Sequence, residues 1–231
     1  MQNNLQQFRR EIEKELIDNI LPFWSSKMPD KQNGGFYGQI TGKDKIVYEA
    51  HKGSVLNARI LWTFSAAYRI CKNPEYLSIA TRAKNYIIDN FIDKKYGGVY
   101  WLLDYKGKPV ETKKQIYALG FAIYGLSEYY RATSDQEALN HAIALYHLVE
   151  KYSFDSEKNG YLEAFTRDWQ LIEDMRLSDK DANEQKTMNT HLHILEPYTN
   201  LYRVWKSDSL KNQLRNLIIV FLEKIIDTKT N

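Results

Sequence analysis

The sequence predicts an all-α fold in which helical hairpins stack around a common axis, with short β-hairpin inserts between them. Three copies of a Gly-aromatic turn mark the repeating units, at residues 33–38, 96–101 and 159–165. The turns recur after 63 and then 62 residues, counted between their glycines. Pairs of helix-like segments lie between the copies. A repeat of this length is typical of stacked hairpins, and such a stack encloses a central cavity for a small polar ligand.

Seven helices follow from apolar residues at helical spacing. They are predicted at about 4–21, 53–71, 75–91, 113–131, 135–152, 187–205 and 208–227. Pro22 is expected to end the first helix, because a proline interrupts helical hydrogen bonding. Ser134 and Asp135 are expected to cap the fifth helix, and Ser207 or Asp208 the last. Consecutive helices after the first therefore form three hairpins.

The inserts between hairpins are predicted to be β-structure. Residues 97–107 read as two short strands joined by a turn, and residues 159–173 read in the same way. Each insert begins within one of the Gly-aromatic turns. No low-complexity linker interrupts the chain, so we expect a single domain over residues 1–231.

Composition narrows the class of protein. The chain has 43% hydrophobic and 26% charged residues, as ordinary globular proteins do. Its 32 basic and 29 acidic side chains are too balanced to predict nucleic-acid binding. No stretch reaches the ~20 apolar residues of a membrane span, and no secretory signal is visible. The single cysteine, Cys71, fits a reducing compartment and is expected to be buried. We therefore expect a cytoplasmic protein that binds neither nucleic acid nor a membrane.

The first helices of the three hairpins align on a closing Tyr-Arg pair. The pairs are Tyr68-Arg69, Tyr130-Arg131 and Tyr202-Arg203. Nine residues before each tyrosine stand Arg59, Phe121 and His193, and thirteen residues before it stand Val55, Tyr117 and Asn189. Positions four apart share one helical face, so these residues form matching stacks on three neighbouring helices.

The residue types in these stacks predict a binding site. A plain core would have aliphatic side chains here, whereas Arg59 offers a cation and Tyr117 a hydroxyl. Asn189 adds an amide and His193 an imidazole. The 17 tyrosines and 5 tryptophans of the chain also suit stacking on sugar rings. These four polar groups are therefore expected to converge on the axis and to bind a polyol.

Competing sites are weakly supported. His191 lies about 200° around the helix from His193, so only one of them faces the cavity, and the register selects His193. Neither histidine has the ligand spacing of a metal site, so we expect no bound metal. The sequence contains no phosphate-binding loop. The carboxylates that could act as acids or bases form no evident pair; they are Glu163, Asp168, Asp181 and Glu196.

Several ordered motifs resemble one known family. They are NGGFYG at 33–38, KGSVLNARILWTFS at 52–65, YGGVYW at 96–101 and KTMNTHLH at 186–193. These motifs resemble the N-acylglucosamine 2-epimerase superfamily, and most of all its cellobiose 2-epimerase branch. The resemblance spans essentially the whole chain, which makes it far more specific than any single pattern.

The resemblance implies a fold and a reaction. The family fold is an (α/α)6 toroid, of which this chain would hold about seven of twelve helices. The family interconverts aldoses and their C2 epimers with no metal or redox cofactor. The cellobiose branch converts the reducing-end glucose of a β-1,4-disaccharide into mannose, by ring opening and a cis-enediolate.

The resemblance also implies roles for individual residues. Arg59, Tyr117, Asn189 and His193 fall on family active-site positions, and Asp181, in the loop before the sixth helix, falls on another. His193 would transfer protons or assist ring opening, as imidazole does at neutral pH. Arg59 and Tyr117 would stabilise the oxyanion at O1 or O2. Asn189 would orient a hydroxyl.

The chain departs from the family in two respects. Two further histidines of the family have no counterpart here, and six units of this length need about 370 residues. We therefore expect residues 1–231 to be the amino-terminal part of an epimerase, and we do not expect His193 alone to support two-base epimerisation. An aldose–ketose isomerase and a non-catalytic carbohydrate- or partner-binding fragment stay open. A glycoside hydrolase is disfavoured, because the inner positions offer no two carboxylates. Oligomeric state does not follow from the sequence.

Overall fold

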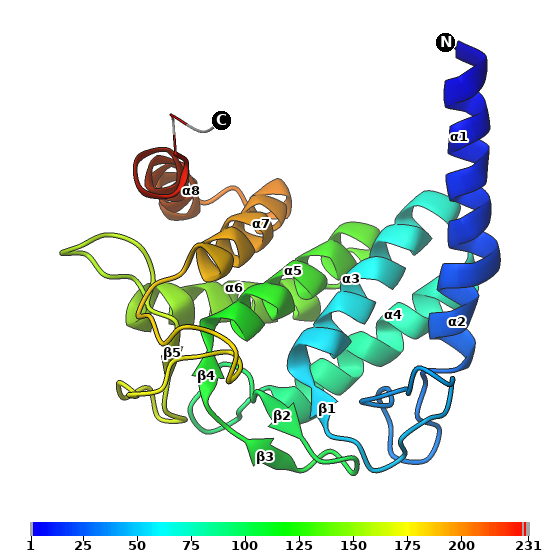
Figure 1. Cartoon of the computed structure of the whole chain (residues 1–231), viewed down its shortest axis with the longest axis horizontal. Coiled ribbons are helices and arrows are strands. Elements are labelled where there is room, and N and C mark those ends of the chain that lie inside the picture. The colour runs from blue at the N-terminus through cyan, green and yellow to red at the C-terminus, as the bar shows by residue number, and fades with distance from the viewer. Residues whose placement is uncertain (1, 228, 230–231) are drawn as a thin grey trace.

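A computed structural model describes residues 2–227 and residue 229. Most of this part of the chain is helical (Figure 1). The α-helices are α1 Gln2–Glu15, α2 Leu21–Ser26, α3 Ser54–Cys71, α4 Pro74–Tyr86, α5 Ile116–Thr133, α6 Gln136–Tyr152, α7 Met188–Val204 and α8 Asp208–Val220. Three π-helical turns adjoin them, η1 Leu16–Ile20, η2 Ile87–Phe91 and η3 Phe221–Ile225. The strands are β1 Lys52–Gly53, β2 Leu102–Leu103, β3 Pro109–Glu111, β4 Lys114–Gln115 and β5 Ala164–Phe165.

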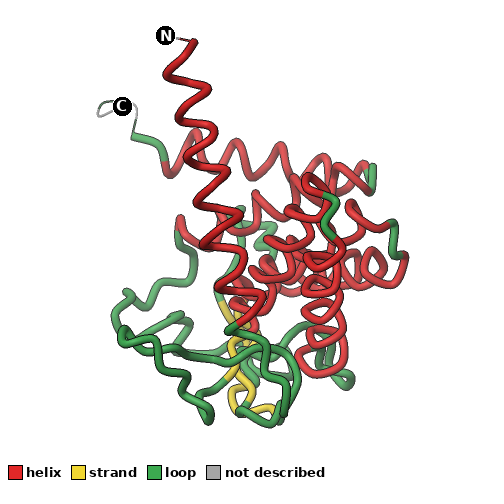
Figure 2. The backbone as a smooth tube through the Cα atoms, turned by 90° about the vertical axis from the view of Figure 1, so that its right-hand side faces the viewer, coloured by secondary structure: helices red, strands yellow, loops and turns green. Residues whose placement is uncertain are grey.

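The helices form an inner and an outer layer. Helices α3, α5 and α7 lie side by side, α5 packing against both of the others (Figure 1). Each packs against the helix that follows it in sequence, so α4, α6 and α8 complete three hairpins. The strands and most of the loops lie at one end of the helices (Figure 2). This arrangement confirms the predicted all-α fold of hairpins with β inserts.

Two details of the helical prediction are wrong. Pro22 does not end the first helix, because the chain continues through η1 into α2, which ends at Ser26. Pro22 occupies the first turn of α2, where a missing N–H costs little. Cys71 is exposed rather than buried, since it ends α3 at the open tip of a hairpin. Both predictions used only the residue type, proline or lone cysteine, whereas the surrounding structure determines the observed conformation and exposure.

The predicted helix caps are present in the structure. The Asp135 side chain accepts a hydrogen bond from the Ala138 amide at the start of α6. The Ser207 side chain accepts from the Leu210 amide at the start of α8. Ser134 instead ends α5 in a left-handed conformation, with φ 63°. Asp135 and Ser207 therefore satisfy backbone donors that would otherwise lack partners.

The β inserts pair with the segments that precede the inner helices. Strand β2 pairs antiparallel with both β1 and β3. A hairpin is therefore present where one is predicted, but its second strand lies at residues 109–111, beyond the predicted range 97–107. Strand β5 pairs antiparallel with β4. Within the predicted insert 159–173, Phe165 also forms an isolated antiparallel bridge with Leu171. Each insert thus pairs with the short strand that precedes the inner helix of the preceding hairpin.

Each Gly-aromatic turn is fastened by an aspartate and a lysine, which we term a turn ion pair. The Nζ–Oδ2 distances are 2.8 Å in the first pair (Lys52–Asp30), 2.9 Å in the second (Lys114–Asp93) and 2.7 Å in the third (Lys186–Asp155). The aspartate also accepts hydrogen bonds from two backbone amides of its own turn. Each lysine stands two residues before an inner helix, so the pair fixes where that helix begins.

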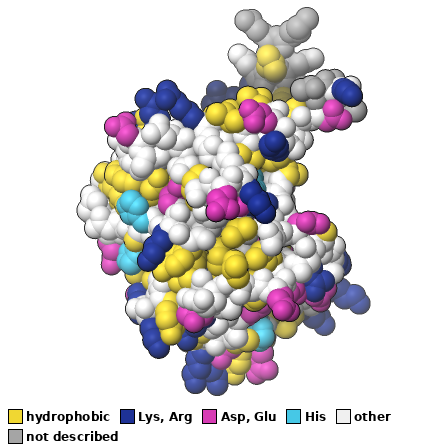
Figure 3. All heavy atoms as spheres, turned by 90° about the vertical axis from the view of Figure 1, so that its left-hand side faces the viewer, with side chains coloured by type: hydrophobic (Ala, Val, Ile, Leu, Met, Phe, Trp, Pro, Cys, Tyr) yellow, Lys and Arg dark blue, Asp and Glu magenta, His cyan; other side chains and the backbone are white. Residues whose placement is uncertain are grey.

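The core fills the space between the two layers. Leu61, Phe64, Leu119 and Ile123 of the inner helices are almost fully buried in it. Large apolar side chains are also exposed on α1 and on the α8–η3 segment, including Leu5, Phe8, Ile12, Ile218, Ile219 and Leu222. Figure 3 shows apolar side chains on the side of the molecule that carries α8. No helix among the described residues is long and apolar enough to cross a membrane.

Candidate active site

Two glycines of α5 let the inner helices approach closely. A Cβ atom on Gly120 would stand 2.1 Å from the carbonyl oxygen of His193 on α7. A Cβ atom on Gly125 would stand 2.8 Å from the carbonyl oxygen of Ala58 on α3. Any other residue at either position would push the helices apart. The glycines therefore bring the side chains on the inner faces of α3, α5 and α7 into contact.

Four side chains meet on these inner faces, and we call them the ring cluster: Arg59, Tyr117, Phe121 and His193. The imidazole of His193 lies 4.8 Å, between ring centroids, from both Tyr117 and Phe121. The two aromatic rings are 5.0 Å apart. The Arg59 guanidinium carbon lies 5.5 Å from the centre of the Phe121 ring, within the range of a cation–π interaction. The stacks that the repeat register predicts therefore face one another.

A carboxylate orients the imidazole of the ring cluster. His193 Nδ1 lies 2.9 Å from Glu196 Oε2, one helical turn along α7. The His193 side chain is 21% exposed and that of Glu196 41%, so solvent reaches both. With Nδ1 held by the carboxylate, Nε2 is the nitrogen available to a ligand. The sequence prediction missed this role of Glu196, although the three-residue spacing from His193 was a usable signal.

A second layer of aromatic side chains continues the inner face. Trp62 stands three residues after Arg59, and Tyr124 three residues after Phe121. Their rings pack with centroids 5.2 Å apart. Burial raises the pKa of Tyr124, and the Glu196 carboxylate raises it further. The same register therefore groups Trp62, Tyr124 and Glu196 one turn beyond the ring cluster.

The Tyr117 hydroxyl stays protonated at neutral pH. Burial raises its pKa above the ordinary value, the Arg59 guanidinium opposes this shift, and the Glu196 carboxylate adds to it. A protonated phenol can donate a hydrogen bond to a developing oxyanion. The ring cluster thus combines an imidazole, a phenol and a guanidinium, which suit proton transfer and anion stabilisation.

His191 has a different environment. Its side chain is 3% exposed. Nε2 accepts a hydrogen bond from the Tyr161 amide at 3.0 Å, and Nδ1 lies 2.7 Å from the Thr187 carbonyl oxygen. These partners require a neutral imidazole that donates from Nδ1, and burial lowers its pKa. His191 therefore fastens the third Gly-aromatic turn to α7 and does not contribute to the ring cluster.

The other two candidate residues lie beside a separate hollow. Asn189 and Asp181 both line a cavity of about 150 Å³ with Arg176. The Asp181 carboxylate accepts hydrogen bonds from the amide and hydroxyl of Ser178, both at 2.8 Å. Asn189 is exposed and stands one helical turn before His193, on the same face of α7. The structure thus joins Arg59, Tyr117 and His193 in one cluster and places Asn189 and Asp181 beside each other.

Arg59 also borders a larger groove at the edge of the inner layer. This groove of about 470 Å³ lies between α3 and the η1–α2 segment, where Trp24 and Val55 also line it. Val55 is one turn before Arg59, as the register predicts. Among the described residues, no three His, Cys, Asp or Glu side chains are arranged to hold a metal ion. The roles of the five candidate residues, and the absence of a metal or cofactor, stay predictions.

Comparisons with known proteins identify the family. Residues 35–231 match the model of the N-acylglucosamine 2-epimerase (GlcNAc 2-epimerase) family. The chain is 61% identical over 223 residues to cellobiose 2-epimerase of Bacteroides fragilis, an alignment that covers 96% of this chain and 57% of that protein. It is 44% identical over 205 residues to cellobiose 2-epimerase of Ruminococcus albus, covering 89% of this chain and 52% of that protein.

Solved structures agree with the sequence comparisons. The structure of cellobiose 2-epimerase from Bacillus thermoamylovorans superposes with a TM-score of 0.93 at 44% identity, covering 97% of this chain and 57% of that one. A D-mannose isomerase superposes with a TM-score of 0.77 at 20% identity, which shows a shared fold alone. The chain thus spans little more than half the length of the relatives it matches. From the family match and these identities, the chain belongs to the N-acylglucosamine 2-epimerase family.

Proposed function

We propose that this chain provides the part of a cellobiose 2-epimerase that binds the reducing-end sugar and carries one of its proton-transfer groups. The observation that carries this proposal is the His193 imidazole, held among Tyr117, Phe121 and Glu196 where three inner helices meet. The relatives named cellobiose 2-epimerase support the choice of substrate, a β-1,4-linked disaccharide of the cellobiose type.

The proposed chemistry starts with opening of the reducing-end ring. The proton on C2 then lies next to an aldehyde and is acidic enough for a base to remove. Removal of that proton gives a cis-enediolate, and return of a proton to the opposite face of C2 gives the epimer. His193 Nε2 is placed to transfer protons, since Glu196 engages Nδ1. A second group, outside the ring cluster, completes the exchange at the other face.

The remaining candidates bind and orient the sugar in this proposal. The Arg59 cation and the protonated Tyr117 hydroxyl stabilise the negative charge on O1 or O2 of the enediolate. Asn189 holds a hydroxyl of the substrate. Asp181, which lines the same cavity as Asn189, binds the sugar at that end of the site. Trp62 and Tyr124 offer aromatic faces for the sugar ring. A cytoplasmic location accords with a single cysteine.

Incubation with cellobiose in D₂O tests the proposal, using two proteins. One is the chain itself, and the other is a chimera that joins residues 1–231 to the remaining part of the Bacteroides fragilis relative. We expect the chimera to form glucosyl-mannose with deuterium at C2, detected by proton NMR and chromatography. A chimera that folds and gives no epimer would contradict the proposal. A ketose product would instead identify an aldose–ketose isomerase.

Carbohydrate binding without turnover is the second candidate function for the chain itself. It is favoured by the ring cluster, in which His193 is the one imidazole, and by the 57% coverage of the Bacteroides fragilis relative. Titration of the 231-residue chain with cellobiose, followed by NMR of the sugar, separates the two functions. Saturable binding with no deuterium at C2 identifies a binding fragment, whereas deuterium exchange identifies an enzyme.

A further inference from the structure

Glu163 connects the starts of two inner helices. It directly precedes β5 and is 2% exposed. Its backbone carbonyl oxygen accepts a hydrogen bond at 2.9 Å from the amide of Ile116, the first residue of α5. Its carboxylate accepts from the Thr187 amide at 2.7 Å and from the Thr190 hydroxyl, both at the start of α7. Glu163 therefore holds α5 by its backbone and α7 by its side chain.

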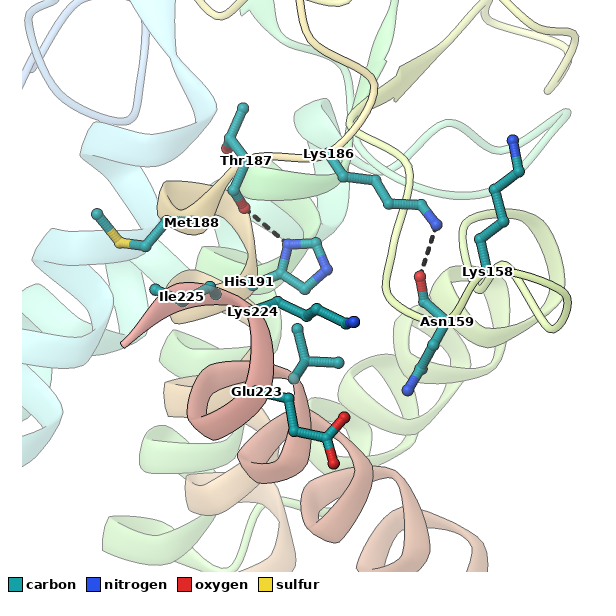
Figure 4. A pocket seen from close by; sticks show the side chains of 10 residues that line it. Lys158, Asn159, Lys186, Thr187, Met188, His191, Glu223, Lys224 and Ile225 are labelled. Atoms are coloured by element: carbon teal, nitrogen blue, oxygen red, sulfur yellow. Dashed lines mark hydrogen bonds between the residues drawn. The ribbon is translucent and has the colours of Figure 1, made fainter. Parts of the chain in front are cut away.

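The side-chain contact completes the N-terminal cap of α7. The Thr187 side chain accepts from the Thr190 amide at 3.2 Å, and the Thr187 carbonyl oxygen lies 2.7 Å from His191 Nδ1 (Figure 4). In a capping box, a Glu or Gln at the third helical position reaches back to the amide of the N-cap residue. Helix α7 has Thr190 at that position and no acidic residue in its first turn. Glu163 supplies the carboxylate instead, from a segment 24 residues before Thr187.

A neutral side chain stands in the place of Glu163 in the preceding repeat unit. The amide that opens α3 donates to the Trp101 carbonyl oxygen at 3.2 Å, as the amide that opens α5 donates to that of Glu163. By the register of the Tyr-Arg pairs, Ala118 of α5 takes the place of Thr190. An indole and a methyl group cannot form this hydrogen bond. The bonded carboxylate is therefore a feature of the unit whose inner helix carries the histidine of the ring cluster.

The Glu163 carboxylate is suited to holding α7 rather than to transferring protons. Its Oε1 is engaged by the Thr187 amide and its Oε2 by the Thr190 hydroxyl. Burial raises the pKa of Glu163 and outweighs the opposing effect of the hydrogen bonds from Thr190 and Thr187. Glu163 also borders the cavity of about 150 Å³ that Asn189 and Asp181 line. It thus lies beside the candidate site with both of its oxygens already bound.

The two residues that bind Glu163 flank a candidate site residue. Asn189 stands between Thr187 and Thr190, and His193 follows three residues after Thr190. The His193 ring contacts that of Tyr117 on α5, with centroids 4.8 Å apart. A shift or rotation of the first turn of α7 would therefore displace Asn189 and alter the contact between the two rings.

We propose that Glu163 is a positioning residue of the candidate active site. Its carboxylate sets the first turn of α7 relative to α5, and with it the place of Asn189 and the ring contact of His193 with Tyr117. Its effect on turnover rests on the proposed function, whereas the ring contact is measured without turnover.

NMR of the 231-residue chain tests the ring contact. Methionine is close to glutamate in size but is only a weak acceptor, so we expect Glu163→Met to weaken about twofold the nuclear Overhauser effects between the ring protons of His193 and Tyr117. Glu163→Gln should preserve them, because its amide group can accept and donate at the same two contacts. Glu157→Met, at an exposed position six residues earlier, is the matched control. An unchanged ring contact in Glu163→Met would overturn the proposal.

Turnover is measured in the chimera with the Bacteroides fragilis relative. We expect Glu163→Met to lower kcat about tenfold and to raise KM about threefold, since the displaced side chains of α7 both bind and react. Glu163→Gln should keep kcat within about threefold of the unmodified chimera. A smaller folded fraction lowers kcat and leaves KM unchanged, so that result would overturn the proposal. Equal losses in both variants with the ring contact intact would also overturn it, because Glu163 would then act as a catalytic carboxylate.

A second variant keeps the test decisive if Glu163→Met does not fold. Thr190→Val removes the hydroxyl that donates to Glu163 at nearly constant volume and leaves the Thr187 contact in place. We expect Thr190→Val to weaken the ring contact and to raise KM about twofold, and Thr190→Ser, which keeps a hydroxyl, to restore both. Equal behaviour of these two variants would overturn the proposal. If the unmodified chimera forms no epimer, the proposed function fails, and the NMR result alone decides whether Glu163 positions α7.

Discussion

Helix α7 carries two histidines, two residues apart, in opposite environments. His191 is 3% exposed and uses both ring nitrogens to hold the third Gly-aromatic turn. His193 is 21% exposed in its side chain, has one nitrogen on Glu196 and packs edge to face with Tyr117. The same side chain therefore stabilises the fold on one face of the helix and remains available to a ligand on the other.

The contrast shows how to separate a structural histidine from a reactive one. A buried imidazole whose two nitrogens are both engaged has no free site for proton transfer. An imidazole with one oriented nitrogen and one free nitrogen meets the requirement for acid–base catalysis. If this distinction is right, substitutions on the two faces should affect different properties: turnover on the His193 face and unfolding free energy on the His191 face.

The largest effect is expected from His193→Ala in the chimera that completes the ring. We expect turnover of cellobiose to fall by about 10²–10⁴-fold, the usual contribution of a positioned acid–base group. The melting temperature should change little, because His193 is partly exposed. His147→Ala, which removes an exposed imidazole on α6, is the matched control. Epimer formation is measured by chromatography, and retained turnover in the variant would remove His193 from the reaction.

Arg59→Ala should have the next largest effect on the same face of the site. If Arg59 stabilises the enediolate oxyanion, its loss raises the barrier by about 2–4 kcal/mol, which lowers kcat/KM by about 30- to 900-fold. Arg69→Ala serves as the control, because Arg69 is on the same helix but pairs with Glu128. An unchanged kcat/KM for the Arg59 variant would place the cation outside the site.

On the other face, His191→Ala should lower the unfolding free energy by about 1–3 kcal/mol. The substitution leaves the buried amide of Tyr161 without an acceptor, and an unsatisfied buried donor costs that amount. Leu192→Ala, at a more exposed position of the same helix, is the control. Urea denaturation followed by circular dichroism measures both. Equal stability of the His191 variant and the unmodified chain would contradict a structural role.

The parts of this contrast that depend on the repeat could be predicted from the sequence. The Tyr-Arg pairs aligned the inner helices, and the resulting register placed Arg59, Phe121 and His193 together, as their ring contacts show. It also separated His191 from His193 by helical geometry alone. The match between register and contacts is possible because every hairpin repeats the same packing.

Long-range features could not be derived in the same way. The lysine of each turn ion pair lies 21 to 31 residues from its aspartate, so no local pattern links the two. The rule that a proline ends a helix fails at Pro22, where a π-helical turn precedes the proline. The rule that a lone cysteine is buried fails at Cys71, where a hairpin tip faces solvent. Asp181 lies in a long loop, whose position relative to Asn189 depends on the folded chain.

The smallest expected effect is a pH dependence that belongs to the His191 face alone. Burial lowers the pKa of His191 in the folded chain, so the unfolded chain binds the proton more readily. Stability from this residue is therefore complete above the ordinary histidine pKa of about 6.5 and declines as the pH falls toward the lower folded value. The slope is at most about 1.4 kcal/mol per pH unit. His191→Asn, compared with the unmodified chain by urea denaturation between pH 5 and 8, removes this contribution and leaves those of other groups. An identical pH profile for the two proteins would mean that His191 does not change its protonation on unfolding, and the contrast between the two histidines would then rest on packing alone.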